Sequence, residues 1–221
     1  SIIWSTDTAI AAQSVCRILE VEGLFWLILS LGLTGGESFF NKLKIVLISA
    51  GLAQGLFAIY QFFVQSIFAS KWLGLSLVKS DYLGAAVIEF LDERWLRAYG
   101  AFPHPNVLGG FLAIVLMVTI MAIWQLRRRL SQQTEFKKAD IYLNIFYWFS
   151  AAMIFLALLF SFSRSAWLGL AAWFLYLLIY AFLKKLKDLK ITLVKLAVFF
   201  LLLLGFSLTA FPYQLFTARI T

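Results

Sequence analysis

The sequence is poor in the residues from which most catalytic and metal sites are built. Its 221 residues include one cysteine, one histidine and three prolines, and only 11 acidic residues stand against 19 lysines and arginines. The lone cysteine, Cys16, cannot form an internal disulfide. One histidine, one cysteine and scattered carboxylates do not supply the ligand spacing of a metal site. The phosphate-binding motif G-x-x-x-x-G-K-[ST] is also absent. We therefore expect no bound metal and no cofactor.

Apolar residues dominate the composition. Hydrophobic residues make up 62% of the chain and aromatic residues 18%, and the mean hydropathy is +0.89. Such values are typical of polytopic membrane proteins rather than soluble domains, and abundant aromatic residues fit the belts at membrane interfaces. We therefore predict an all-α fold, a polytopic bundle of transmembrane helices in the lipid bilayer. In such a protein the net charge of +8 sets the topology, and we expect no nucleic-acid partner.

Six apolar runs predict about five spans, because the first run is weak. The runs cover residues 14–33, 44–68, 106–125, 141–160, 167–183 and 193–211. In the first run only Gly23 to Leu33 is fully apolar, which is short for a span of about 20 residues. In the second run Gln54, Gln61 and Gln65 fall on one helical face, and we expect this face to pack against protein rather than lipid.

The basic residues assign an orientation to these helices. The positive-inside rule places the lysine- and arginine-rich loops at about 126–140 and 184–192 in the cytoplasm, together with the loop at about 34–43. The outer loops are then residues 1–13, 69–105, 161–166 and 212–221. Within the longest, residues 85–100 (AAVIEFLDERWLRAYG) fit either an amphipathic surface helix or a short hairpin. Because the chain opens on Ser1 rather than methionine, we expect residues 1–221 to be one partial transmembrane domain of a longer protein.

One polar loop runs directly into an apolar helix at residues 97–116 (RAYGAFPHPNVLGGFLAIVL). Two prolines flank His104 and bias it, and the residue before the first proline, towards extended backbone. Asn106 stands where a helix N-cap belongs, because the apolar run follows it at once. Gly109 and Gly110 leave room for another backbone or a ligand to approach the start of this helix.

Three of the four arginines on the predicted outer side stand near a span, against the positive-inside pattern. Arg97 precedes the helix just described, Arg164 sits in a tight turn between two apolar helices, and Arg219 follows the last span. An ionisable residue at the membrane rim indicates a functional site, although an arginine can also snorkel to headgroups or bind helix-end carbonyls. Guanidinium groups bind phosphates through parallel hydrogen bonds and stay charged at every working pH. The arginines therefore predict a site for a lipid-borne anion such as a diphosphate. His104 beside it is either a general base or a hydrogen-bonding partner of the loop.

Two sequence motifs lie at this rim. The first is R-x-x-G-x-F-x-x-P-N entering a predicted membrane helix, and the second is S-R-S-A-W opening a later one. Their residues here are Arg97, Gly100, Phe102, Pro105 and Asn106, followed by Ser163, Arg164, Ser165, Ala166 and Trp167. Together the two motifs resemble those of the O-antigen ligase and O-antigen polymerase superfamily. One inward span and one outward span separate the motifs, as in the family, and the resemblance covers most of residues 20–221.

The resemblance implies a multi-pass glycosyltransferase of the bacterial inner (plasma) membrane. Such enzymes transfer or polymerise a glycan from undecaprenyl diphosphate on the outer face, without a metal, in the biosynthesis of lipopolysaccharide and other cell-surface polysaccharides. The resemblance implies that Arg97, Arg164 and Arg219 bind the donor diphosphate. Residues of the supporting loops would be Gly100, His104, Pro105, Asn106, Ser163 and Ser165.

The resemblance leaves the catalytic residue and the acceptor open. The catalytic histidine of the family lies in a large outer loop, which would fall beyond Thr221 here, and His104 does not match it. We therefore expect the parent protein to be an enzyme and residues 1–221 to be inactive alone. The acceptor is a glycan, a lipid or a protein, according to whether the parent is a polymerase, a ligase or a protein O-oligosaccharyltransferase. The alternative from another class is a membrane transporter, or a protein that binds a lipid diphosphate or another anion without catalysis.

Overall fold

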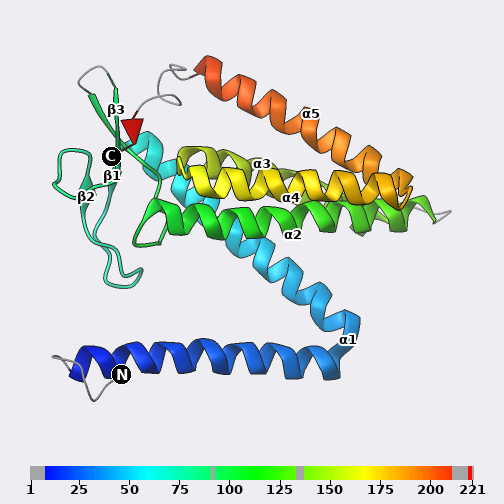
Figure 1. Ribbon diagram of the computed structural model, residues 1–221, viewed down its shortest axis with the longest axis horizontal. Coiled ribbons are helices and arrows are strands. Elements are labelled where there is room, and N and C mark those ends of the chain that lie inside the picture. Colours follow the sequence, from blue (N-terminus) through cyan, green and yellow to red (C-terminus); the bar gives the residue numbers. More distant parts are fainter. Residues whose placement is uncertain (1–7, 91–92, 133–136, 211–218, 221) are drawn as a thin grey trace. The chain divides into compact units, whose positions relative to one another are not determined.

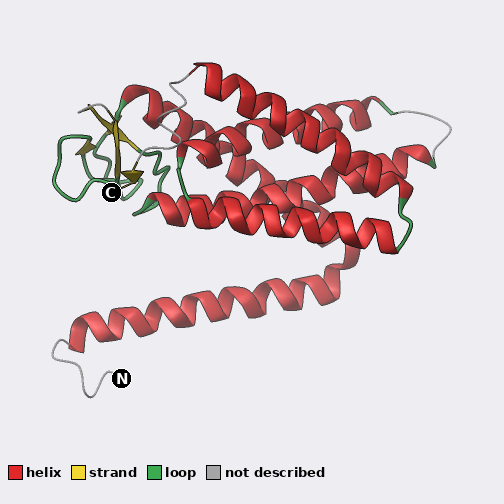
Figure 2. Cartoon of the chain, turned by 45° about the horizontal axis from the view of Figure 1, so that its top comes forward, coloured by secondary structure: helices red, strands yellow, loops and turns green. Residues whose placement is uncertain are grey.

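Five long helices make up most of the chain in the computed structural model, which describes residues 8–90, 93–132, 137–210 and 219–220 (Figure 1). The helices are α1 (Thr8–Val64), α2 (Pro105–Ser131), α3 (Lys138–Phe160), α4 (Arg164–Leu183) and α5 (Lys187–Ala210). The strands are β1 (Ser66–Ile67), β2 (Val78–Lys79), β3 (Val87–Phe90), β4 (Glu93–Leu96) and β5 (Arg219–Ile220). Figure 2 shows how little strand there is beside the helices. The predicted all-helical class is confirmed, and each of the five helices is long and apolar enough to cross a membrane.

The chain divides into two compact units, Ser1–Val46 and Leu47–Thr221, which we call the N-terminal unit and the main unit. From Thr8 onward the N-terminal unit is helical, except at Gly36, whose φ of 55° and ψ of −146° interrupt α1. Glycine adopts a positive φ without steric cost, so one residue is enough to break the helix. The loops predicted at 1–13 and 34–43 are therefore wrong in extent. Residues 8–13 and nearly all of 34–43 are helical, while residues 1–7 lie outside the described part.

The kink at Gly36 also explains the unusual length of α1. A helix of 57 residues measures about 85 Å, whereas the hydrocarbon core of a bilayer is about 30 Å thick. The kink divides α1 into two helical segments of about 40 Å, and each is long enough for one crossing. The apolar run predicted at residues 14–33 lies within the first segment. The run predicted at 44–68 ends too late, because the second segment ends at Val64 and Ser66–Ile67 form β1.

Helix α2 is the centre of the main unit and contacts α3, α4 and α5. Its fully buried residues Leu112, Leu116 and Ile120 belong to one apolar cluster with Ala151 and Ile154 of α3. Helices α4 and α5 are apolar too, but most of their surface is exposed. An apolar helix that is exposed in this way is suited to face lipid tails rather than water.

Helices α2 to α5 begin earlier or end later than the apolar runs indicate. The loops predicted at 126–140, 161–166 and 184–192 are too long, because α2 continues to Ser131 and the next three helices begin at Lys138, Arg164 and Lys187. Lysine and arginine are good helix formers, and cations in a last turn, such as Arg128 and Arg129 in α2, interact favourably with the helix dipole. An apolar run shows where the hydrocarbon ends, and the helix can continue beyond that point.

The arginine motifs and the basic helix ends lie at opposite ends of the main unit. The strands gather at the end where α2 and α4 begin, while α2 and α4 finish at the other end (Figure 1). At that second end Arg129 forms an ion pair with Asp140, the buried acid in the first turn of α3. The predicted orientation requires this separation, with basic loops on one side and the arginine motifs on the other.

Residues 85–100 contain a hairpin, which decides between the two alternatives left open by the sequence. Strands β3 and β4 pair antiparallel, with Val87 opposite Leu96 and Ile88 opposite Trp95. The β-branched and aromatic residues here favour a strand, and Val87, Ile88 and Leu96 are almost completely buried. Strand β5 adds to the free side of β3, and β1 and β2 form a separate two-stranded pair. The sheet covers the end of the bundle from which the arginine loop emerges.

Candidate functional site

A glutamine of α1 fixes the loop that carries Arg97. Gln61 is fully buried, and its Nε2 donates to the Gly100 carbonyl at 2.9 Å. Its Oε1 accepts from the Gly100 amide at 2.8 Å and from the Tyr99 amide at 3.3 Å. The loop has no regular secondary structure at this point, so its buried backbone groups need such partners. One side chain therefore supplies three of the hydrogen bonds that position the arginine loop.

Two further glutamines on the same helical face bind the loop on either side. Gln54 Oε1 accepts from the Ala101 amide at 2.9 Å, and Gln65 Oε1 accepts from the Leu96 amide at 2.6 Å. The prediction that this face packs against protein is confirmed. The partner of this face is the arginine loop, which the glutamine spacing alone does not specify.

Gly100, the glycine of the first motif, is required by the shape of the loop. Its φ is +61°, a conformation that side chains rarely adopt. A Cβ at this position would lie 2.8 Å from Gln54 Oε1 and 2.9 Å from Leu108 Cδ1. Gly100 therefore lets the loop turn closely between α1 and α2, and its role is structural.

Arg97 is a buried cation with neutral hydrogen-bonding partners. Only 3% of the residue is exposed. Its Nε donates to the Ser161 carbonyl at 2.9 Å, and its Nη2 donates to Asn106 Oδ1 at 2.7 Å. Burial lowers the pKa of the guanidinium, Tyr99 raises it, and the charge of Arg164 lowers it. Burying a charge is costly unless it is compensated. The neutral oxygen atoms fix the side chain in place but do not neutralise it, so a bound anion would stabilise this arrangement.

The three-residue turn between α3 and α4 lies directly against α2. Ser161 and Ser163 are completely buried, and Phe162 between them has a positive φ of 49°. A Cβ at Gly109 would lie 2.5 Å from Ser163 Cβ and 3.1 Å from Ser161 Oγ. Gly109 therefore lets the serine side chains of this turn pack closely against α2. Around Gly110 there is open space within 4 Å.

Arg164 begins α4 at the same end of the main unit and is exposed. The serines on either side of it have their Oγ atoms 3.4 Å apart. Arg164 is close enough to Arg97 for its charge to lower the pKa of that residue. The N-terminus of a helix carries a partial positive charge of its own. Two guanidinium groups and a helix N-terminus thus converge on one region, and an anion placed there would relieve their repulsion.

The predicted N-cap, Asn106, is wrong, because His104 caps α2. His104 Nδ1 accepts a hydrogen bond from the Asn106 amide at 3.1 Å, and the extended backbone predicted for His104 is confirmed (φ −151°, ψ 142°). Pro105 takes the first helical position, where its missing N–H costs nothing, and so moves the helix start towards His104. Burial lowers the pKa of His104, and the charge of Arg97 lowers it further, which favours the neutral ring that can accept this bond. The Asn106 side chain positions Arg97 instead of capping the helix.

Arg219 approaches this region through its backbone. Strand β5 pairs antiparallel with β3, and Arg219 stands opposite Glu89 in the register. The Arg219 side chain and residues 211–218, part of the outer loop predicted at 212–221, lie outside the described residues. The structure therefore joins the Arg97 and Arg164 motifs directly and joins Arg219 to them only by strand pairing.

The groups whose roles the sequence does not reveal are neutral and buried. Gln61 and the backbone carbonyl of Ser161 hold Arg97 or its loop, and neither resembles a ligand-binding group. The glutamine spacing was a usable signal, because buried amides on one face of a membrane helix need hydrogen-bonding partners. A backbone carbonyl leaves no trace in the sequence.

The site combines two arginines with neutral hydrogen-bonding groups. Within the described ranges, no group of three or more histidine, cysteine, aspartate or glutamate residues could hold a metal ion. No family model, curated protein or solved structure matches this chain. The resemblance to O-antigen ligases and polymerases therefore stays a prediction that rests on the two motifs.

Proposed function

We propose that this protein binds the diphosphate of an undecaprenyl-linked glycan at Arg97 and Arg164, on the outer face of the bacterial inner membrane. Its parent chain would transfer or polymerise that glycan, as the resemblance to O-antigen ligases and polymerases implies. The single observation that carries the proposal is the buried Arg97 guanidinium, fixed by neutral oxygen atoms and repelled by Arg164. A pair of cations in this arrangement is suited to a ligand with more than one negative charge.

The proposed chemistry uses the arginines to stabilise the leaving group. An acceptor hydroxyl attacks the anomeric carbon of the donor sugar, the bond to the diphosphate oxygen breaks, and the diphosphate leaves with additional negative charge. Preorganised donors aimed at the place where charge develops stabilise the transition state. Arg97 is preorganised by Ser161 and Asn106. The residue that accepts the proton of the hydroxyl lies outside this chain in the proposal, since His104 Nδ1 already accepts the Asn106 amide.

Charge reversal at Arg164 tests the proposal. In detergent micelles, Arg164→Glu should bind undecaprenyl diphosphate at least about ten-fold more weakly than the unaltered chain, because a charge-assisted hydrogen bond contributes about 1.5–3 kcal/mol. Arg128→Glu is the matched control. It makes the same change of net charge at an exposed arginine at the opposite end of the main unit, and its affinity should not change.

The transfer step is tested in the same variants of the parent chain. If Arg164→Glu inserts into the membrane normally and still transfers glycan at the unaltered rate, the arginine clamp is wrong. Tight diphosphate binding by a parent chain that transfers nothing would favour the alternative, a transporter or an anion-binding protein without catalysis.

A further inference from the structure

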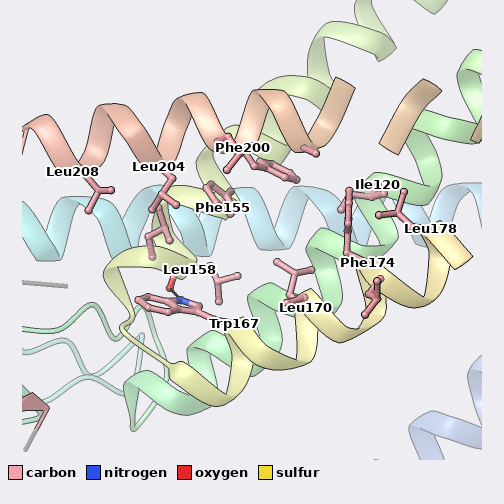
Figure 3. A pocket seen from close by; sticks show the side chains of 15 residues that line it. Ile120, Phe155, Leu158, Trp167, Leu170, Phe174, Leu178, Phe200, Leu204 and Leu208 are labelled. Carbon is pink, nitrogen blue, oxygen red and sulfur yellow. Dashed lines mark hydrogen bonds between the residues drawn. The ribbon is translucent and has the colours of Figure 1, made fainter. Parts of the chain in front are cut away.

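An apolar groove of about 700 Å³ opens among the helices of the main unit (Figure 3). It lies among α2, α3, α4 and α5. Fifteen side chains line it, and the indole nitrogen of Trp167 is their only polar atom. A groove with so few polar groups is suited to an apolar ligand, because such a ligand would leave hardly any hydrogen-bonding group of the lining without a partner.

The length of the groove along its helices is close to the thickness of one leaflet of a bilayer. Along α4 its lining runs from Trp167 to Leu178, and along the antiparallel α5 it runs from Leu208 back to Ala197 (Figure 3). At 1.5 Å per residue each stretch measures about 16 Å. Half of a hydrocarbon core of about 30 Å is nearly the same length. A chain that enters at the Trp167 end could therefore lie in the groove throughout one leaflet.

Trp167 connects the groove with the arginine rim. Its indole Nε1 donates to the Leu158 carbonyl at 3.0 Å, which fixes the ring at the head of the groove. Its backbone amide donates to the Ser163 carbonyl at 3.0 Å, and Arg164 lies within the same turn of α4. The cationic rim and the apolar groove are thus consecutive parts of one surface. This order, charge followed by hydrocarbon, matches a lipid with an anionic head group and a long chain.

We propose that the α4–α5 groove holds the isoprenoid chain of the lipid diphosphate. The inference rests on the proposed function, since the chain belongs to the lipid whose diphosphate Arg97 and Arg164 bind. Both helices that form the mouth of the groove are largely exposed and apolar, so a lipid can enter from the bilayer. The groove selects the donor by its chain, and the arginines select it by its charge.

Two neighbouring alanines of α4 provide a matched test. Ala171 and Ala172 are both exposed, but only Ala171 lines the groove. Binding of undecaprenyl diphosphate and of inorganic diphosphate, which has no chain, is measured for Ala171→Phe and Ala172→Phe. We expect Ala171→Phe to lose about ten-fold in affinity for undecaprenyl diphosphate, or about 1.4 kcal/mol, which corresponds to the burial of about two methylene groups. Its affinity for inorganic diphosphate, and both affinities of Ala172→Phe, should not change.

The possible failures are distinguishable. If Ala171→Phe binds undecaprenyl diphosphate like the unaltered chain, the groove inference is overturned, and a helix of a second copy or of another segment would cover the groove. Equal loss of both probes in Ala171→Phe also overturns it, because the effect would not depend on the chain. If Arg164→Glu binds both probes normally while Ala171→Phe loses only the lipid, the groove stands and the proposed arginine clamp fails.

Discussion

One added methyl group at Gly109 should disturb the rim from the side of α2. The Cβ of Gly109→Ala would lie 2.5 Å from Ser163 Cβ, whereas ordinary contact begins at 3.4 Å, a shortfall of 0.9 Å. Ser163 Cβ is attached directly to the backbone, so no change of rotamer can relieve the clash. Overpacking of this kind costs about 1–3 kcal/mol, and the better helix propensity of alanine offsets up to about 1 kcal/mol. The turn must move away from α2, and with it the Ser161 carbonyl that holds Arg97.

Gly110→Ala is the matched control for this substitution. It adds the same methyl group to the next residue of the same helix, where a Cβ would meet no atom within 4 Å. Thermal unfolding and undecaprenyl diphosphate binding are measured for both variants in one detergent. We expect Gly109→Ala to have the lower melting temperature and the weaker binding, and Gly110→Ala to equal or exceed the unaltered protein in stability. Equal melting temperatures and equal affinities would refute the close packing of α2 against the turn.

Three further substitutions test the hydrogen bonds and the ion pair. Gln61→Leu removes three hydrogen bonds from the arginine loop at a cost of about 2–4 kcal/mol, and the Gly100 amide should then exchange with solvent faster while exchange in α3 is unchanged. Because the folded pKa of His104 is lowered from its ordinary value of 6.5, the unfolded chain binds the proton first, and stability should fall as the pH drops below about 6.5. The free energy of unfolding should fall by no more than about 1 kcal/mol, which is the usual contribution of a helix N-cap, and His104→Asn should abolish this pH dependence. Arg129→Met should lower the melting temperature more than Asp140→Asn, because it leaves a carboxylate whose side chain is 6% exposed without its partner, whereas the Arg129 side chain is 51% exposed. Equal losses in these two variants would contradict that account.

The sequence predicts the helices well because membrane helices are specified by composition. An apolar run of about 20 residues has few alternatives to a transmembrane helix. The errors concern the helix ends. Arg127, Arg128 and Arg129 were assigned to a loop because they are polar, yet α2 continues through them because polar residues outside the hydrocarbon can remain helical. At residues 34–43 a loop of ten residues was expected, but the helix is interrupted only at Gly36, because one glycine with a positive φ is enough to change its direction.

The candidate site was predictable only in part. Arginines on the predicted outer side are visible in the sequence, because they depart from the positive-inside pattern. The burial of Arg97 is not visible, since it depends on the hairpin, on Gln61 and on the turn after α3. The misassigned cap at Asn106 has a local cause: proline at position 105 fixes the first helical residue, so the residue before it takes the cap. His104 can fill that position because its neutral Nδ1 is an acceptor.

The most direct test of the central claim is the position of a bound diphosphate in an experimental structure of the protein with undecaprenyl diphosphate. The account predicts diphosphate oxygen atoms within about 3 Å of the guanidinium groups of both Arg97 and Arg164, as in charge-assisted hydrogen bonds. It also predicts that the Arg97 bonds to Ser161 and Asn106 are retained. A diphosphate bound instead among the basic residues at the other end of the main unit would contradict the account, as would a diphosphate that contacts neither arginine.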